Sequence, residues 1–202
     1  MSHRAFIIGD PHFGHGSLFK FRRADGSPLR PLWDNPDAMD EDMVKWWNEI
    51  VRPVDKTYIL GDVAMYKKCL PILARLNGRK CLIKGNHDIS KLKDYAKYFY
   101  DIRAYHRLDG IWMSHIPIHP QSVGRVYGNI HGHIHDQEVK IIGTQDIDPR
   151  YMCVSAEHTN YRPLEWGEAK ERLFKRQEEF AHLMPPKEEE YPPTTEVEKQ
   201  KK

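Results

Sequence analysis

Short apolar runs alternate with helix-like segments along the first half of the chain. Three runs have the length expected of buried β-strands: residues 5–8, 57–60 and 80–84. A helix is predicted from Asn35, which can cap its first turn, because Pro36 and Asp37 suit the positions that follow. A shorter helix is predicted at residues 70–76. Strands that alternate with helices in this way predict a parallel sheet with crossover connections, and therefore an α/β fold.

The second half of the chain has a different pattern. Apolar runs at residues 102–108 and 111–113 flank an Asp-Gly dipeptide, which is typical of a β-hairpin. Further strands are predicted at residues 126–130 and 151–155, and further helices at residues 90–99 and 167–182. The charged, proline-containing stretch 184–202 has no apolar periodicity. It predicts a disordered tail after a single domain that spans residues 1–183.

Polar side chains with metal-binding chemistry follow the predicted strands. Asp10 and His12 come after the first strand, Asp62 after the second, and Asn86 and His87 after the third. Because ligands bind outside the carboxyl ends of parallel strands, we expect these side chains to lie together at one edge of the sheet. Three further histidines follow later β-like runs: His115, His133 and His135.

Apart from His87, these seven residues offer imidazole nitrogens, carboxylates and one amide oxygen, but no thiolate. Such donors suit Mn, Fe, Zn, Ni or Co better than a cysteine-rich structural zinc site. Seven ligands are too many for one tetrahedral ion and fit two ions that share a carboxylate. Because strand residues two apart point the same way, Asp10 and His12 can reach one ion, and His133 and His135 can reach neighbouring ions.

Composition narrows the functional classes. The chain has 202 residues, of which 40% are apolar, enough for one core of ordinary size. The net charge of +2 gives no sign of a surface that binds polyanions. After Met1-Ser2-His3-Arg4, only four apolar residues precede Gly9, too few for a signal peptide or a membrane span, so we expect a soluble, cytoplasmic protein. Three widely separated cysteines, Cys69, Cys81 and Cys153, are predicted to be buried free thiols.

These motifs together resemble the calcineurin-like metallophosphoesterases. The resemblance rests on Asp-x-His at 10–12, Gly-Asp at 61–62, Gly-Asn-His-Asp at 85–88, the single His115 and Gly-His-x-His at 132–135. It implies a four-layered αββα sandwich with a dinuclear metal centre. It also implies that Asp10, His12, Asp62 and His135 hold the first ion, and Asp62, Asn86, His115 and His133 the second. His87 matches the proton donor or transition-state stabiliser of that family. The stretch 10–15 and Tyr161-Arg162-Pro163 also resemble a small bacterial and phage branch.

Two departures from the family patterns bear on the substrate. Family members that act on phosphoproteins have Asp-Arg-Gly after the Gly-Asp motif, whereas this chain has Tyr66 in the position of that arginine. The DNA-repair nucleases have a second histidine three residues beyond the bridging aspartate, where this chain has Met65. Both departures argue against those activities.

A metal-bridging hydroxide is therefore expected to attack the phosphorus, while His87 stabilises the developing charge or protonates the leaving oxygen. Five residues are expected in loops that overhang the site, where they could hold a phosphate or a sugar: His15, Arg22, Arg23, His119 and Arg125. Phe13, Trp33 and Tyr127 could supply an apolar or stacking surface, although core packing is the more ordinary role for Trp33.

The predicted function is hydrolysis of small phosphodiesters such as nucleotides, with Mn as the expected metal. A diester carries one negative charge, which suits a site without a dedicated phosphate-binding arginine. The alternatives are a phosphomonoesterase or nucleotidase, a metal-dependent nuclease, and a non-catalytic interaction module. The near-neutral charge favours a small substrate over nucleic acid, and no membrane partner is expected. The sequence does not determine the oligomeric state.

Overall fold

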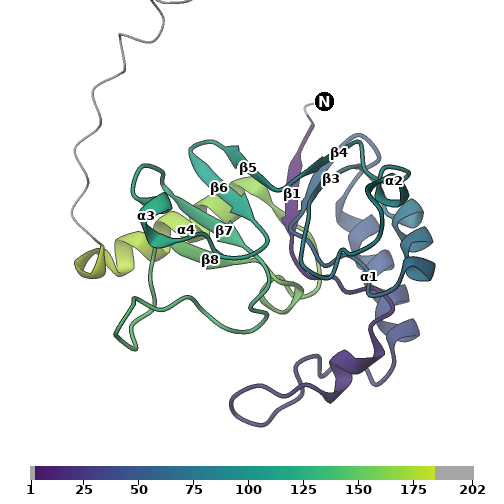
Figure 1. Cartoon of the computed structure of the whole chain (residues 1–202), viewed down its shortest axis with the longest axis horizontal. Helices are drawn as coiled ribbons and strands as arrows, with labels where there is room; N and C mark the ends of the chain where they lie inside the picture. The colour runs from purple at the N-terminus through teal and green to yellow at the C-terminus, as the bar shows by residue number, and fades with distance from the viewer. Residues whose placement is uncertain (1–2, 185–202) are drawn as a thin grey trace, which may run out of the picture.

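Two stacked β-sheets form the centre of the protein, whose computed structural model describes residues 3–184 (Figure 1). The first sheet has the strand order β4-β3-β2-β1-β9. Its strands are β1 (Ala5–Ile8), β2 (Lys56–Ile59), β3 (Arg79–Ile83), β4 (Asp101–Arg103) and β9 (Leu164–Glu165). The strands β1 to β4 are parallel, and β9 runs antiparallel to β1. The carboxyl ends of four strands therefore point to the same edge.

The second sheet has the order β5-β6-β7-β8. Its strands are β5 (Tyr105–Leu108), β6 (Ile111–Ser114), β7 (Gly128–His131) and β8 (Tyr151–Cys153). The first two strands form the predicted antiparallel hairpin, whereas β6, β7 and β8 are parallel. This sheet therefore also delivers several carboxyl ends to one edge.

An apolar core fills the space between the two sheets. Ile7 and Ile83 of the first sheet belong to the same buried cluster as Met113 and Ile130 of the second. The helix α4 (Trp166–Glu179) adds Leu173 to this cluster and contacts β1 and β9. Burial of these side chains fixes how the two sheets face each other.

A second core lies on the outer face of the first sheet. There α1 (Pro36–Ile50) buries Met39, Met43 and Trp47. Asn35 caps this helix as predicted, since its Oδ1 accepts a hydrogen bond of 2.9 Å from the backbone N–H of Ala38. The 3₁₀ helix η2 (Lys67–Arg75) covers the same face.

The remaining helical segments are short. They are η1 (Gly16–Lys20), α2 (Leu92–Tyr95), α3 (Pro120–Val123), η3 (Ala156–His158) and η4 (Ala181–Leu183). None of these segments in the described part of the chain is long enough to organise a core of its own.

Several predicted boundaries were wrong. The helix predicted at residues 70–76 is 3₁₀, and Pro71 inside it lacks the N–H that an α-helix interior needs. The helix predicted at residues 90–99 is reduced to α2. The hairpin strand predicted at residues 102–108 is interrupted at the exposed Ala104, so that β4 joins the first sheet and β5 joins the second. The two-residue strand β9 was missed.

The mixed α/β arrangement of two stacked sheets confirms the predicted fold class. Cys81 and Cys153 are buried free thiols as predicted, whereas Cys69 is only half-buried. The tail predicted from residue 184 lies, apart from Met184, outside the described residues.

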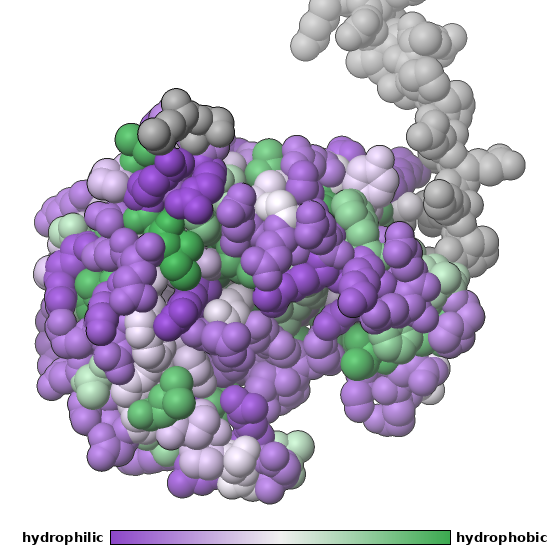
Figure 2. Space-filling model, turned by 180° about the vertical axis from the view of Figure 1, so that it is seen from behind, coloured by the Kyte–Doolittle hydropathy of each residue, from purple (hydrophilic) through white to green (hydrophobic). Residues whose placement is uncertain are grey.

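The surface agrees with the composition of the chain. In the view of Figure 2, the coloured face is mostly hydrophilic, and its apolar areas are small and separate. Within residues 3–184, no helix has both the length and the apolar character that crossing a membrane requires.

Candidate metal centre

The candidate site lies where the strands of both sheets end. Backbone hydrogen bonds join these ends directly, because the N–H of Asp10 donates to Gly61 O (3.2 Å) and that of His12 to Asp62 O (3.0 Å). In the second sheet, the N–H of Gly132 donates to His115 O (3.0 Å). The turns after β1, β2, β6 and β7 are thus fixed relative to their neighbours.

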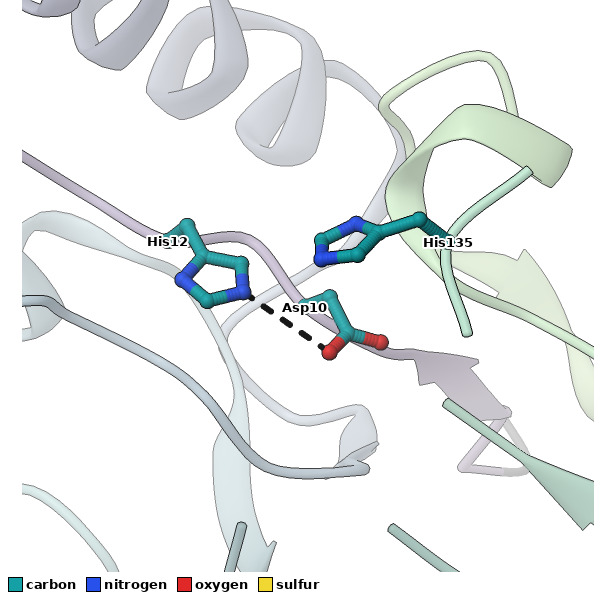
Figure 3. A group of neighbouring side chains, drawn as sticks. All are labelled: Asp10, His12 and His135. Carbon is teal, nitrogen blue, oxygen red and sulfur yellow. Dashed lines mark ion pairs between the residues drawn. The ribbon is translucent and has the colours of Figure 1, made fainter. Parts of the chain in front are cut away.

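The first group of candidate ligands is Asp10, His12 and His135, shown in Figure 3. One ligand atom from each residue lies within 4.8 Å of the others. His12 Nε2 is 3.8 Å from Asp10 Oδ1, and the rings of His12 and His135 stack with their centroids 5.2 Å apart. The N–H of His133 also donates to Asp10 Oδ2. Segments that are 123 or more residues apart in the sequence therefore meet at this site.

The second group is Asp62, His115 and His133, whose ligand atoms also lie within 4.8 Å of one another. His133 Nδ1 is 3.2 Å from His115 Nε2. Asn86 belongs beside this group, because its Oδ1 is 2.7 Å from the same His115 nitrogen.

Asp62 stands between the two groups. Its Oδ2 is 3.7 Å from His12 Nε2 in the first group and 3.4 Å from His115 Nε2 in the second. One carboxylate oxygen that faces ligands on both sides is the arrangement that two neighbouring cations can share.

Asp10 and Asp62 each accept hydrogen bonds from the rest of the chain through one carboxylate oxygen. Asp10 Oδ2 accepts hydrogen bonds from Ser155 Oγ (2.6 Å) and from the N–H of His133 (2.8 Å). Asp62 Oδ1 accepts one from the N–H of His87 (2.8 Å). The opposite oxygens remain directed at the histidines, which orients both carboxylates before any ion arrives.

Several polar atoms at this site are buried without a hydrogen-bond partner among the described residues. They are Asp10 Oδ1 and both ring nitrogens of His12. Burying such atoms unpaired is costly. Burial also raises the pKa of Asp10 to about 6 and lowers that of His12 well below its usual value. A cation bound between these atoms would give them a partner and would stabilise the charged form of Asp10. The donor set therefore fits a divalent metal ion.

The second group already contains opposite charges. Burial alone would raise the pKa of Asp62, but the hydrogen bond and charge of His115 lower it overall. Burial would likewise lower the pKa of His115, yet the interactions with Asp62 and Asp10 raise it. Metal binding would replace this proton-mediated pairing with coordination.

The backbone at the site is strained. Eight non-glycine residues of the described chain have positive φ, and five of them are candidate ligands: Asp10, His12, Asp62, His133 and His135. Left-handed φ costs non-glycine residues of the order of 1–3 kcal/mol each. Such strain persists only where the surrounding structure imposes it, and it commonly occurs at functional sites.

Asp88 connects the turns after β2 and β3, a role that its place in the Gly-Asn-His-Asp motif did not reveal. Its Oδ2 accepts from the N–H groups of Asp62 (2.9 Å) and Gly85 (2.8 Å), and its Oδ1 from that of Val63 (3.0 Å). This fully buried carboxylate thereby fixes Asp62 relative to the turn that carries His87.

Arg30 and Glu157 form a buried pair that sequence reasoning missed. The guanidinium of Arg30 donates to Glu157 Oε1 (2.8 Å), Pro11 O (2.9 Å) and Asp10 O (2.6 Å). The same Glu157 oxygen is 3.2 Å from His135 Nδ1. Burial alone would raise the pKa of Glu157, but Arg30 and His135 lower it to about 2. This pair holds the turn of Asp10 and the ring of His135 together.

His87 lies beside the first group without belonging to it. Its ring centroid is 5.8 Å from that of His12, and its side chain is exposed. The structure therefore brings together all eight residues that the sequence singled out for the site.

Of the five loop residues expected to contact a substrate, three make other contacts, one lies away from the site and one lies beside a candidate ligand. Arg22 donates to Phe19 O and Phe21 O in its own loop, and Arg23 donates to Leu29 O. His119 caps α3, accepting from the N–H of Gln121. Arg125 follows α3 and precedes the start of β7, at the end of the strand away from His131. The residue beside a candidate ligand is His15, whose ring centroid is 5.1 Å from that of His12.

The three aromatic residues expected near the site do not form its wall. Phe13 is completely buried in the core. Trp33 packs against Trp46 and Tyr161, as its more ordinary role predicted. The N–H of Tyr127 donates to Gly110 O in the β5–β6 turn, at the opposite end of the second sheet.

A methyl group at Gly132 should disturb the centre. A Cβ there would overlap Asp10 Oδ2 and lie 3.0 Å from Leu60 O, whereas nothing lies within 4 Å of a Cβ at Gly167 in α4. We expect Gly132→Ala to lower the melting temperature by about 5 °C and to weaken metal binding, because overpacking costs about 1–3 kcal/mol. Gly167→Ala, the matched control, should be neutral or slightly stabilising. Equal melting temperatures for the two variants would contradict this account of the turn.

Comparison with known proteins agrees with the geometry. The family model described as calcineurin-like phosphoesterase matches residues 3–196. The uncharacterized protein MJ1445 of Methanocaldococcus jannaschii is 28% identical over 167 residues, which are 80% of this chain and 86% of that protein. The crystal structure of AQ665 from Aquifex aeolicus, a protein of unknown function, has the same fold, with a TM-score of 0.58 and 23% identity over 84% of this chain and 99% of that one. Since the family model covers most of its length, this chain belongs to the calcineurin-like phosphoesterases.

Proposed function

We propose that the protein is a dinuclear metal-dependent phosphodiesterase that hydrolyses small diesters such as nucleotide esters. The observation that carries the proposal is the position of Asp62 Oδ2 between the two ligand groups. Family membership supports phosphoester hydrolysis as the general activity. The substrate class is our inference from the residues around the site.

The residues divide into two ligand sets. Asp10, His12 and His135 would hold one ion with Asp62, and Asn86, His115 and His133 would hold the other with the same Asp62. The nitrogen and oxygen donors suit manganese, which we favour, and also iron, zinc, nickel and cobalt. Divalent ions bound there supply an activated water at neutral pH and neutralise charge on the phosphoryl group.

His87 is the residue we assign to proton transfer. Its backbone N–H is fixed by Asp62 Oδ1, while its exposed ring forms no side-chain hydrogen bond with another described residue. An imidazole in that position can donate a proton to the leaving ester oxygen. Because Asp88 fixes the same turn, the ring is held near the ligands without serving as one.

The preference for a diester rests on the arginines. Arg30 is completely buried, and its guanidinium binds Glu157 and two carbonyl oxygens. Arg22 and Arg23 donate to carbonyl oxygens of their own loop, and Tyr66 occupies the position of the phosphoprotein-branch arginine. A singly charged diester needs less compensation than a doubly charged monoester, so these arginine positions favour the diester.

A small substrate and a cytoplasmic location complete the proposal. The net charge of +2 offers little attraction for a long polyanion. Three free thiols suit a reducing compartment.

Replacing Asp62 should affect both ions. We expect Asp62→Asn to leave little bound manganese, because Asp62 Oδ2 lies near the Nε2 atoms of both His12 and His115, one in each group. Asp10→Asn should mainly remove the first ion. Metal analysis after equilibration with manganese measures this difference. Asp146→Asn, at an exposed loop position, serves as the control and should keep the wild-type content. A wild-type chain that binds only one ion at saturation would refute the dinuclear proposal.

Replacing His87 should separate chemistry from metal binding. We expect His87→Ala to lower kcat by about 10²- to 10⁴-fold, the usual contribution of general acid catalysis, with nearly unchanged metal content. His119→Ala removes another exposed histidine and should retain activity. If His87→Ala instead loses metal but keeps its rate per bound ion, our assignment of this residue is wrong.

The ester preference can be measured with matched aryl substrates. With manganese at neutral pH, we expect kcat/KM for methyl p-nitrophenyl phosphate to exceed that for p-nitrophenyl phosphate. The leaving group is the same in both, so the difference reports the charge on the phosphate. A monoester preference of tenfold or more would indicate a nucleotidase or a general phosphatase.

A further inference from the structure

Residues 13–34, which we call the arm, carry an aromatic side chain to the edge of the metal centre. In Figure 1 the arm extends below the sheets, on the side where β1 ends. Its contacts with the core include the completely buried Phe13, Leu18 and Arg30 and the nearly buried Leu29. Phe21, in contrast, keeps 48% of its surface exposed.

The conformation around Phe21 is fixed by backbone hydrogen bonds. Its N–H donates to Leu18 O (3.1 Å), and its carbonyl oxygen accepts from the N–H of Leu29 (3.1 Å). Both partners are core residues, so this part of the arm is tied to the body of the protein. An exposed aromatic ring on a fixed backbone loses little entropy on binding a ligand.

His15 connects Phe21 to the candidate ligands. The Phe21 ring meets the His15 ring edge-on with centroids 6.2 Å apart, and His15 lies 5.1 Å from His12. Burial and the neighbouring charge of His87 lower the pKa of His15. The three rings therefore form a continuous row from a candidate ligand to the surface.

Within residues 3–184, the polar atoms of the His15 side chain have no hydrogen-bond partner. Only 7% of the residue is exposed, yet its Nδ1 is buried without a hydrogen bond, and its ring makes no side-chain hydrogen bond to another described residue. Buried imidazoles normally have such partners. A phosphate held beside His12 would bring an acceptor oxygen to this neighbourhood.

We propose that His15 and Phe21 form the subsite for the non-leaving half of the diester, which we infer to carry a planar aromatic group such as a nucleobase. His15 donates a hydrogen bond to a phosphoryl oxygen, and the exposed face of Phe21 stacks on the ring of the substituent. This inference rests on the proposed phosphodiesterase function and names its substrate class. It also replaces the stacking residues that the sequence had indicated.

The test compares two diesters that share a p-nitrophenolate leaving group. Thymidine 5′-(p-nitrophenyl) phosphate carries a nucleobase in the other half, and methyl p-nitrophenyl phosphate carries none. We expect Phe21→Leu to lower kcat/KM about tenfold for the thymidine ester, the scale of one lost stacking contact, with less than about twofold change for the methyl ester. Phe21→Trp should retain the wild-type preference. Phe174→Leu changes a comparably exposed phenylalanine on α4 and should alter neither rate.

His15 should have a different signature because it acts on the phosphate common to both substrates. We expect His15→Ala to lower kcat/KM for both diesters by about tenfold, with partial recovery in His15→Gln, which restores a donor. Binding to the manganese-loaded protein gives an independent readout. There Phe21→Leu should weaken thymidine 5′-monophosphate and leave methyl phosphate unchanged, whereas His15→Ala should weaken both.

The outcomes separate this inference from the proposed function. Hydrolysis of both diesters with equal effects of Phe21→Leu on the two, or with no effect, would overturn the subsite and leave the phosphodiesterase standing. Hydrolysis of neither diester by the wild-type protein would overturn both. Loss of the thymidine ester preference in Phe174→Leu as well would show that the effect is not local to the arm.

Discussion

The candidate centre depends on two buried carboxylates, each of which accepts hydrogen bonds through one oxygen and faces histidines with the other. One oxygen of Asp10 accepts hydrogen bonds from Ser155 Oγ and the N–H of His133, and one oxygen of Asp62 accepts from the N–H of His87. Each remaining oxygen faces histidines, and that of Asp62 faces both ligand groups. These hydrogen-bond donors come from both sheets. The shape of the site therefore depends on the relative position of the two sheets. A shift of either sheet would separate the ligands.

This arrangement carries a cost in the absence of metal. Five candidate ligands have left-handed backbone conformations, and Asp10 and His12 bury polar atoms without partners. Burial of the two apolar clusters and the hydrogen bonds of Asp88 and Arg30 hold the turns despite this cost. An ion that binds only the folded chain adds stability by mass action. Function and stability are therefore coupled at the same atoms.

The sequence predicted which candidate ligands lie together better than it predicted the residues that support them. Asp10, Asp62 and Asn86 follow apolar runs, and the rule that parallel strands end at one edge places them together without further information. Arg30 and Glu157 could not be found in that way, because they are 127 residues apart, one in a loop and the other in the short 3₁₀ helix η3. Ser155 ends the predicted strand 151–155, but that position does not reveal its hydrogen bond to Asp10. The aromatic wall was misplaced because loop residues such as Phe13 and Tyr127 carry no periodic signal that separates core from surface.

Crystals grown with manganese would test the central claim most directly through anomalous scattering. We predict two anomalous peaks, one among Asp10, His12 and His135 and one among Asp62, His115 and His133, with the Asp62 carboxylate in contact with both. A single peak, or peaks away from Asp62, would contradict the account of a shared carboxylate on which the proposed chemistry depends.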